Sequence, residues 1–317
     1  MNAPSSPLLF GSMWLVVTAL VFLLPLLPAL RELYSRSDAD ALAIDPLDNG
    51  RTDYAAQRMA EQLGLLEAMP RVAQWRLDDQ GRLMVPRGHG RLMAKTGQPL
   101  VIGFRSQLRA LVSSDMVELQ ANSSVQRVLH AKSIHCLGPV QLARLTSAER
   151  HIVLAPGTRF FRLAANCVFT WPLKRSLHFP LPELGNGMPL TELQKRHEGD
   201  LRIAAGSVVQ GGLVVTGNLW MEEMTVVVGH IKVHGNASLA KGACVQGALF
   251  VLGDLQTKGN NYVEGPLCAG KRLQLGPESQ VGSKQCPSSV SAWSIALQAS
   301  VRVYGSIAAV RSGQVVL

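Results

Sequence analysis

Four consecutive segments in the last third of the chain share one pattern: GGLVVTGNL (211–219), GHIKVHGNA (229–237), GALFVLGDL (247–255) and GPLCAGKRL (265–273). Their first glycines stand at 211, 229, 247 and 265, so the spacing is the same each time. The shared frame has glycine first, apolar residues third and fifth, glycine seventh and Asn or Asp eighth; the last copy has Lys271 and Arg272 at the seventh and eighth positions. GDLRIAAG (199–206) fits the second half of the same frame.

This 18-residue repeat is too short for helical repeats, which need about 33 to 47 residues. It suits one coil of three short strands, joined at corners where glycine, Asn or Asp tolerate unusual dihedral angles. Successive coils would pair their backbones at about 4.8 Å. We therefore predict an all-β fold, a β-solenoid with about 18 residues per coil, over residues 199–317.

The repeat assigns each side chain a place in the coil. The coil corners are predicted at Gly199, Gly211, Gly217, Gly229, Gly235, Gly247, Gly253 and Gly265. Alternation at period 2 sends every second side chain inward. The predicted core contains Leu213, Val215, Ile231, Val233, Leu249, Val251 and Leu267, and further on Val301 and Val303. The last two lie in VRVYGSIAA (301–309), whose offset from the frame implies an insertion within 283–298.

The same alternation turns His230, Lys232 and His234 outward on one strand. They form a candidate surface stripe that would contact acidic lipid, glycan or a partner. The simpler interpretation is a solvated strand face.

Residues 8–30 form an uncharged, mostly apolar run. As a helix it would span about 34 Å, enough to cross a bilayer, and the run lacks the basic start and cleavage site of a signal peptide. We therefore expect a transmembrane anchor within 1–34. Arg31 and Arg36 follow the run and no Lys or Arg precedes it, which favours a single-pass bacterial inner-membrane protein with its bulk in the cytoplasm.

Between the anchor and the regular repeat the sequence pattern is less regular. Residues 35–98 are expected to form a linker, a short helix and irregular structure, and residues 99–170 an irregular β or solenoid-like region. The segment 171–198 holds four prolines and is predicted to be an insertion or connecting loop.

Composition excludes several classes of function. The chain of 317 residues carries a net charge of +9, only 5% aromatic residues and five scattered cysteines without a CxxC pair. Aromatic residues are too scarce for a typical nucleic-acid surface, and no cofactor motif is present. His130, His135 and Cys136 are potential metal ligands, but no matching set occurs elsewhere, so structural histidines and a buried thiol are the preferred interpretation. No nucleophile–base arrangement is visible, and we expect neither catalytic residues nor a metal site.

The run from GDLRIAAGSVVQGGLVVTGNL through GALFVLGDL to VRVYGSIAA resembles the bactofilins, polymer-forming bacterial cytoskeletal proteins. The resemblance covers residues 199–317. It implies nucleotide-independent end-to-end self-assembly into a homopolymer or homo-oligomer, and scaffolding of cell-envelope or polysaccharide machinery, with envelope-synthesis proteins as partners and no nucleic acid. The alternative is a hexapeptide-repeat acyltransferase that uses His230 or His234 as a general base.

End-to-end assembly needs an open terminal coil. The C-terminal segment RSGQVVL (311–317) contains no helical cap. The last coil is therefore the candidate for pairing with another chain, unless a bulge or a docked segment covers it.

Overall fold

The computed structural model describes residues 14, 18, 76–77, 83–85, 93–96, 99–172 and 195–316. The chain divides into two compact units, Met1–Arg51 and Thr52–Leu317. In the first unit Trp14 and Thr18 are helical, and the Thr18 hydroxyl donates a hydrogen bond to the Trp14 carbonyl (2.8 Å). All further description concerns the second unit.

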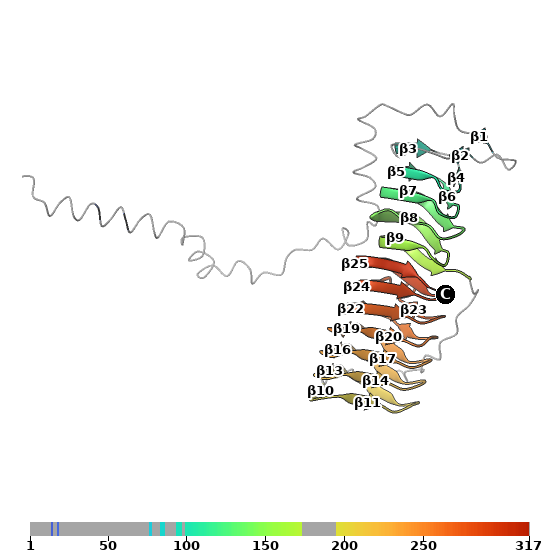
Figure 1. Ribbon diagram of the computed structural model, residues 1–317. Coiled ribbons are helices and arrows are strands. Elements are labelled where there is room, and N and C mark those ends of the chain that lie inside the picture. Colours follow the sequence, from blue (N-terminus) through green and yellow to red (C-terminus); the bar gives the residue numbers. More distant parts are fainter. Residues whose placement is uncertain are drawn as a thin grey trace, which may run out of the picture. The chain divides into compact units, whose positions relative to one another are not determined.

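The second unit is a β-solenoid of about 11 turns, which confirms the predicted fold class (Figure 1). Its coils come from two segments of the chain. The first segment, here called the N-terminal stack, contains β1 (Arg76–Leu77), β2 (Leu83–Val85), β3 (Met93–Thr96), β4 (Leu100–Ile102), β5 (Gln107–Ser113), β6 (Met116–Leu119), β7 (Ser124–Cys136), β8 (Leu145–Leu154) and β9 (Arg159–Thr170).

The second segment, the C-terminal stack, has three faces, and the strands within each face pair in parallel. Face A contains β10 (Lys195–His197), β13 (Leu213–Val215), β16 (Ile231–Val233) and β19 (Leu249–Val251). Face B contains β11 (Leu201–Ile203), β14 (Leu219–Met221), β17 (Ala237–Leu239) and β20 (Leu255–Thr257). Face C contains β12 (Val208–Gln210), β15 (Val226–Val228), β18 (Cys244–Gln246), β21 (Tyr262–Val263) and β23 (Gln280–Val281). The longer β22 (Leu267–Leu275), β24 (Ser288–Leu297) and β25 (Arg302–Val315) turn the corner from face A to face B.

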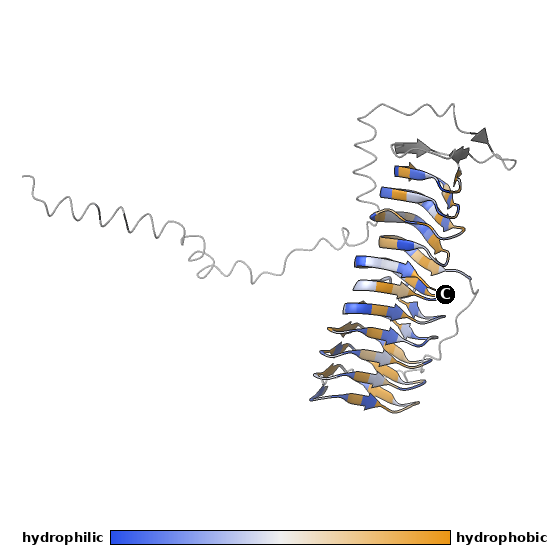
Figure 2. Cartoon of the chain, viewed as in Figure 1, coloured by the Kyte–Doolittle hydropathy of each residue, from blue (hydrophilic) through white to orange (hydrophobic). Residues whose placement is uncertain are grey.

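The register of the C-terminal stack follows the repeat seen in the sequence. Leu213 pairs with Ile231, and Ile231 pairs with Leu249. These side chains are stacked in the interior, at 5%, 0% and 0% exposure. Alternate residues lie outside, so the strands change between apolar and polar along their length (Figure 2). Burial of each such Leu or Ile side chain stabilises the fold by about 1.5–3 kcal/mol.

The predicted insertion is confirmed by a jump in register. Tyr262 pairs with Gln280, as the repeat requires, whereas Leu267 pairs with Val290 instead of with position 285. The additional residues therefore lie between Val281 and Ser288. After them the step is again close to that of the repeat, with Ser294 opposite Ser312.

Residues 99–170 also form solenoid coils, but with a different step. Leu83 pairs with Leu100, and Leu100 with Val117, so each coil here is one residue shorter than in the C-terminal stack. Bulges then lengthen or shorten this step by one residue at single coils. Two corners are built by Arg105 and Asn122, each with φ near 59°, in place of glycine.

The two stacks meet at their last coils. β25 pairs antiparallel with β9, with Val303 opposite Val168 and Ile307 opposite Leu163. β9 and β25 therefore lie side by side in the middle of the solenoid, and β10 and β11 form one end of it (Figure 1). The second stack runs in the opposite direction both along the axis and around it, so the two stacks wind with the same hand.

This junction corrects the expectation of an open C-terminal coil. The N–H of Gly157 donates to the carbonyl of Val315, and the N–H of Val315 donates to the carbonyl of Thr158 (both 2.9 Å). The C-terminal strand is thus paired on both sides, with β24 and with β9. The sequence did not indicate this because nothing in a strand's pattern specifies its antiparallel partner.

Within the described residues, no helix has both the length and the apolar character needed to cross a bilayer. The predicted span at 8–30, apart from Trp14 and Thr18, lies outside the described residues, as do the short helix expected before residue 70 and most of the segment 171–198.

Candidate functional site

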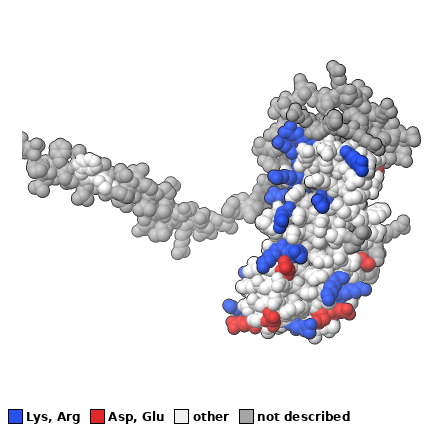
Figure 3. Space-filling view, in the orientation of Figure 1, with Lys and Arg blue, Asp and Glu red and all other residues white. Residues whose placement is uncertain are grey.

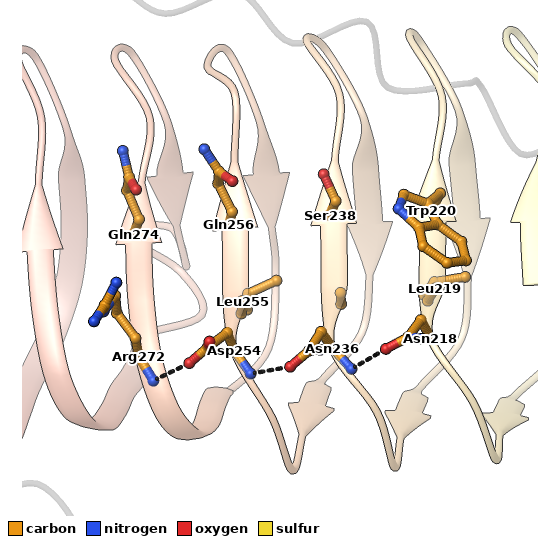
Figure 4. A pocket seen from close by; sticks show the side chains of 11 residues that line it. Asn218, Leu219, Trp220, Asn236, Ser238, Asp254, Leu255, Gln256, Arg272 and Gln274 are labelled. Atoms are coloured by element: carbon orange, nitrogen blue, oxygen red, sulfur yellow. Dashed lines mark hydrogen bonds between the residues drawn. The ribbon is translucent and has the colours of Figure 1, made fainter. Parts of the chain in front are cut away.

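The corner between faces A and B carries a ladder of Asn and Asp side chains. Asp200 Oδ1 accepts a hydrogen bond from the N–H of Asn218 (2.7 Å), and Asn218 Oδ1 accepts one from the N–H of Asn236 (2.9 Å). Asn236 and Asp254 continue the ladder to Arg272, at 2.8 and 2.9 Å. Each side chain thus satisfies a backbone donor of the next coil, which fixes the edge of the groove shown in Figure 4.

Beside the ladder, the outer side chains of face B form a continuous row along both stacks. Register pairs connect eleven positions, here called the polar row: Gln107, Ser124, Gln141, Arg159, Gln314, Ala296, Gln274, Gln256, Ser238, Trp220 and Arg202. All of them are exposed or half-buried, and all except Ala296 and Trp220 are Gln, Ser or Arg. Ten steps of about 4.8 Å give the row a length of about 48 Å.

Two neighbouring cavities hollow this face. One of about 380 Å³ lies between Asn218 and Gln274, with Trp220, Ser238 and Gln256 on its floor (Figure 4). The other, of about 660 Å³, contains Trp293, Arg311 and Gln314. Asp254 and Arg272 contribute to both, so the two cavities form one groove.

Two tryptophans are exposed in this groove. Trp220 is 37% exposed on the outer side of β14, and Trp293 is 52% exposed at the bulge between Ala292 and Ser294. They are four coils apart, about 19 Å. Trp220 lies in the middle of β14 and faces outward.

A line of cations follows the corner between faces A and B. This basic ridge consists of Arg109, Arg127, Arg144, Arg311 and Lys271. Each of them lies, within its own coil, between a residue in register with face B and a residue in register with face A. None of the five forms an ion pair with another described residue. In the view of Figure 3, Lys and Arg gather over the part of the stack formed by β5–β9, and acids gather toward the end formed by β10 and β11.

The end coil, residues 195–210, is the second candidate surface. β10, β11 and β12 each pair on one side only, with β13, β14 and β15. No other described strand pairs with their outer edges. The carbonyl oxygen of Ser207 and the N–H of Gly211 form hydrogen bonds with β15. Backbone groups of successive residues in a strand point to opposite sides, so the N–H groups of Val208 and Gln210 face away from the stack. Val208 is 54% exposed.

The candidate stripe occupies one strand of face A. His230, Lys232 and His234 are all exposed, on either side of the buried Ile231 and Val233. The neighbours of Lys232 in register are Val214 and Phe250, so the cations do not continue from coil to coil. His230 Nδ1 accepts a hydrogen bond from the N–H of Ala248 (3.0 Å), which leaves Nε2 as the protonated nitrogen of the neutral ring.

The corner glycines contact the preceding coil closely. A Cβ on Gly235 would lie 2.6 Å from the carbonyl oxygen of Gly217, and one on Gly229 would lie 2.5 Å from that of Gly211. The remaining predicted corners, Gly199, Gly247, Gly253 and Gly265, occupy the same two columns. The predicted core side chains are all at most 5% exposed.

The histidines and cysteines of the N-terminal stack do not converge on one point. His130 Nδ1 bonds to Ser147 Oγ (2.9 Å), whereas His135 Nε2 bonds to His151 Nε2 (2.8 Å). Burial raises the pKa of the Cys136 thiol to about 12, which leaves it protonated and weakly nucleophilic. The described residues contain no group of three or more His, Cys, Asp and Glu placed to hold a metal ion.

The polar row was not predicted from the sequence, although half of it leaves a pattern there. Its C-terminal part was visible as a column of Trp220, Ser238, Gln256 and Gln274, each three positions after a corner and one full repeat from the next. The N-terminal part was not visible, because its step changes from coil to coil.

Comparisons of the chain with protein-family models, with curated proteins and with solved structures find no match.

Proposed function

We propose that the chain is a membrane-anchored scaffold that self-assembles through the open edge of its 195–210 coil. The observation that carries the proposal is the row of outward backbone groups on β10, β11 and β12, which have no partner among the described strands. Such an edge is a template for another chain.

The internal junction supports a pairing between identical end coils. β9 and β25 already show that two coils of this cross-section can meet antiparallel. A second copy of the 195–210 coil, turned about a two-fold axis, would meet the first in the same way. At the other end β1 pairs with the outer edge of β2, whereas all three strands of the 195–210 coil pair on one side only, so this coil offers the longer open edge.

The resemblance to bactofilins supports the same proposal and adds its cellular setting. We propose that residues 8–30 hold the chain in a bacterial inner membrane, with the solenoid in the cytoplasm, where it would organise envelope or polysaccharide machinery. A reporter fused after residue 317 tests the orientation: cytoplasmic activity is expected, and periplasmic activity would reverse it.

Self-assembly is tested by sedimentation velocity and electron microscopy of the purified full-length protein over a range of concentrations. A dimer whose fraction rises with concentration is expected, because a two-fold interface between identical end coils closes at two copies. Val208→Pro removes an outward N–H without removing a bond to β15, so it should abolish assembly and leave the melting temperature nearly unchanged. Val208→Thr retains the N–H and should assemble like the parent.

Two results would overturn the proposal. A parent protein that stays monomeric at every concentration excludes self-assembly. Equal assembly of Val208→Pro and Val208→Thr, with both folded, excludes the 195–210 edge as the site.

A further inference from the structure

We propose that face B is a binding surface for an extended acidic polysaccharide, which lies along the solenoid axis over the polar row and beside the basic ridge. This inference does not depend on self-assembly. It rests on the groove, on two exposed tryptophans and on unpaired cations, none of which belongs to the end coil.

The polar row matches a ligand rich in hydroxyl groups. Gln256 and Gln274 each present an amide that donates and accepts, and Ser238 presents a hydroxyl that does both. They point into the same groove from adjacent coils (Figure 4). A sugar hydroxyl is also donor and acceptor, so a repeating chain of sugars would meet a repeating set of partners.

The tryptophans supply flat apolar surfaces in an otherwise polar groove. Trp220 and Trp293 leave 37% and 52% of their surfaces exposed, although burial of an indole is favourable. The C–H face of a sugar ring fits such a surface. Their separation of about 19 Å, with amides and hydroxyls between them, suits a ligand of several linked rings.

The cations require a ligand that carries negative charge. Arg272, Arg311 and Lys271 contribute to the larger cavity, whose only acid is Asp254. Oδ1 of Asp254 is already held by the N–H of Arg272 (2.9 Å). A guanidinium binds a carboxylate or sulfate through two parallel hydrogen bonds, so uronic or sulfated sugars fit and neutral sugars fit less well.

Single-stranded nucleic acid is the main rival for a basic groove. It requires aromatic platforms for successive bases. Face B has amides and hydroxyls on three consecutive coils between its two tryptophans, which favours the polysaccharide.

The test measures binding of polygalacturonate, neutral dextran and oligo-dT to the purified full-length protein by fluorescence titration. Polygalacturonate should bind best, and its affinity should fall as salt rises from about 0.05 to about 0.5 M. The double variant Arg272→Gln, Arg311→Gln and the single variant Trp220→Ala should each weaken binding by about tenfold or more. Lys232→Gln, an exposed cation on face A, is the control and should bind like the parent.

Repeating the titration in the Val208→Pro background separates this proposal from self-assembly, because the groove is unchanged there. Undetectable binding of polygalacturonate, equal binding of dextran, or tighter binding of oligo-dT would each overturn the proposal. So would equal losses in Lys232→Gln and in the double arginine variant, provided that all variants keep the parent's circular dichroism spectrum.

Discussion

At the residue scale, the corner glycines differ in what they require. Gly235 has an ordinary φ, but no space for a side chain, because the carbonyl of Gly217 lies below it. Gly206 has a φ of 69° and open space around it. The first position therefore excludes a side chain by contact with the coil below, and the second selects only for backbone conformation.

The same substitution at both positions separates these causes. Gly235→Asn should destabilise the protein by about 1–3 kcal/mol, because the side chain would force two coils apart. Gly206→Asn should change stability by less than about 0.5 kcal/mol, since Asn tolerates the left-handed region. Urea unfolding of the full-length variants measures both, and similar losses at the two positions would refute the contact with the coil below.

The His135–His151 pair makes stability depend on pH. Burial lowers the pKa of both histidines from 6.5; Glu118 opposes this at His135, and the charges of His135 and Arg150 reinforce it at His151. Well above pH 6.5 both rings are neutral in the folded and unfolded states. At lower pH the unfolded chain binds protons at these two rings that the folded chain does not bind, so the free energy of unfolding decreases as the pH falls.

We therefore expect the melting temperature to fall between about pH 7 and about pH 5. His135→Gln combined with His151→Gln should reduce that fall, because neither amide titrates. His234→Gln, at an exposed position, serves as the control and should leave the fall unchanged. A pH profile identical in all three proteins would contradict the role of the pair.

At the scale of elements, the junction of β9 and β25 depends on one close contact. The ring of Phe160, which is 1% exposed, occupies the space that a side chain at Gly313 would need. The two residues are opposite each other in register. The ring of one stack is thus packed on the backbone of the other.

A double-mutant cycle tests this contact. Gly313→Ala should cost about 1–3 kcal/mol, because its methyl group overlaps the Phe160 ring. Adding Phe160→Leu should recover part of that loss, with a coupling energy of about 0.5 kcal/mol or more. Phe160→Leu combined with Gly235→Asn, several coils away, should instead be additive. Additivity in both cycles would show that the contact does not hold the junction.

The elements of the C-terminal stack were predictable because their step is constant. A side chain such as Ile231 then lies over Leu213 and under Leu249, and the glycine column between coils repeats with them. The N-terminal stack uses Arg105 and Asn122 at corners and changes its step at bulges, so its coils carry no visible period. The groove is lined by the C-terminal stack alone, and its Asn and Asp corner was recognisable in the sequence. The polar row continues into the N-terminal stack, where no constant period marks it.

At the scale of the whole second unit, the antiparallel junction determines which surfaces are available. Because each stack ends at the middle, the first coils of the two stacks form the two ends. The C-terminal strand is closed, the 195–210 edge is open, and face B runs without interruption across the junction from Arg202 to Gln107. Both proposals depend on this arrangement.

The most direct test of the arrangement is a disulfide across the junction. Ala164 and Ser306 are opposite each other on β9 and β25, and cross-strand Cβ atoms are about 4.5–5.5 Å apart, close enough for a bond after small shifts. With Cys268 and Cys286 replaced by Ser, Ala164→Cys with Ser306→Cys should form an intramolecular disulfide, identified by mass spectrometry. Ala164→Cys with Ser291→Cys, one coil further away, should not. Absence of the first bond, or equal formation of both, would contradict the junction of the two stacks.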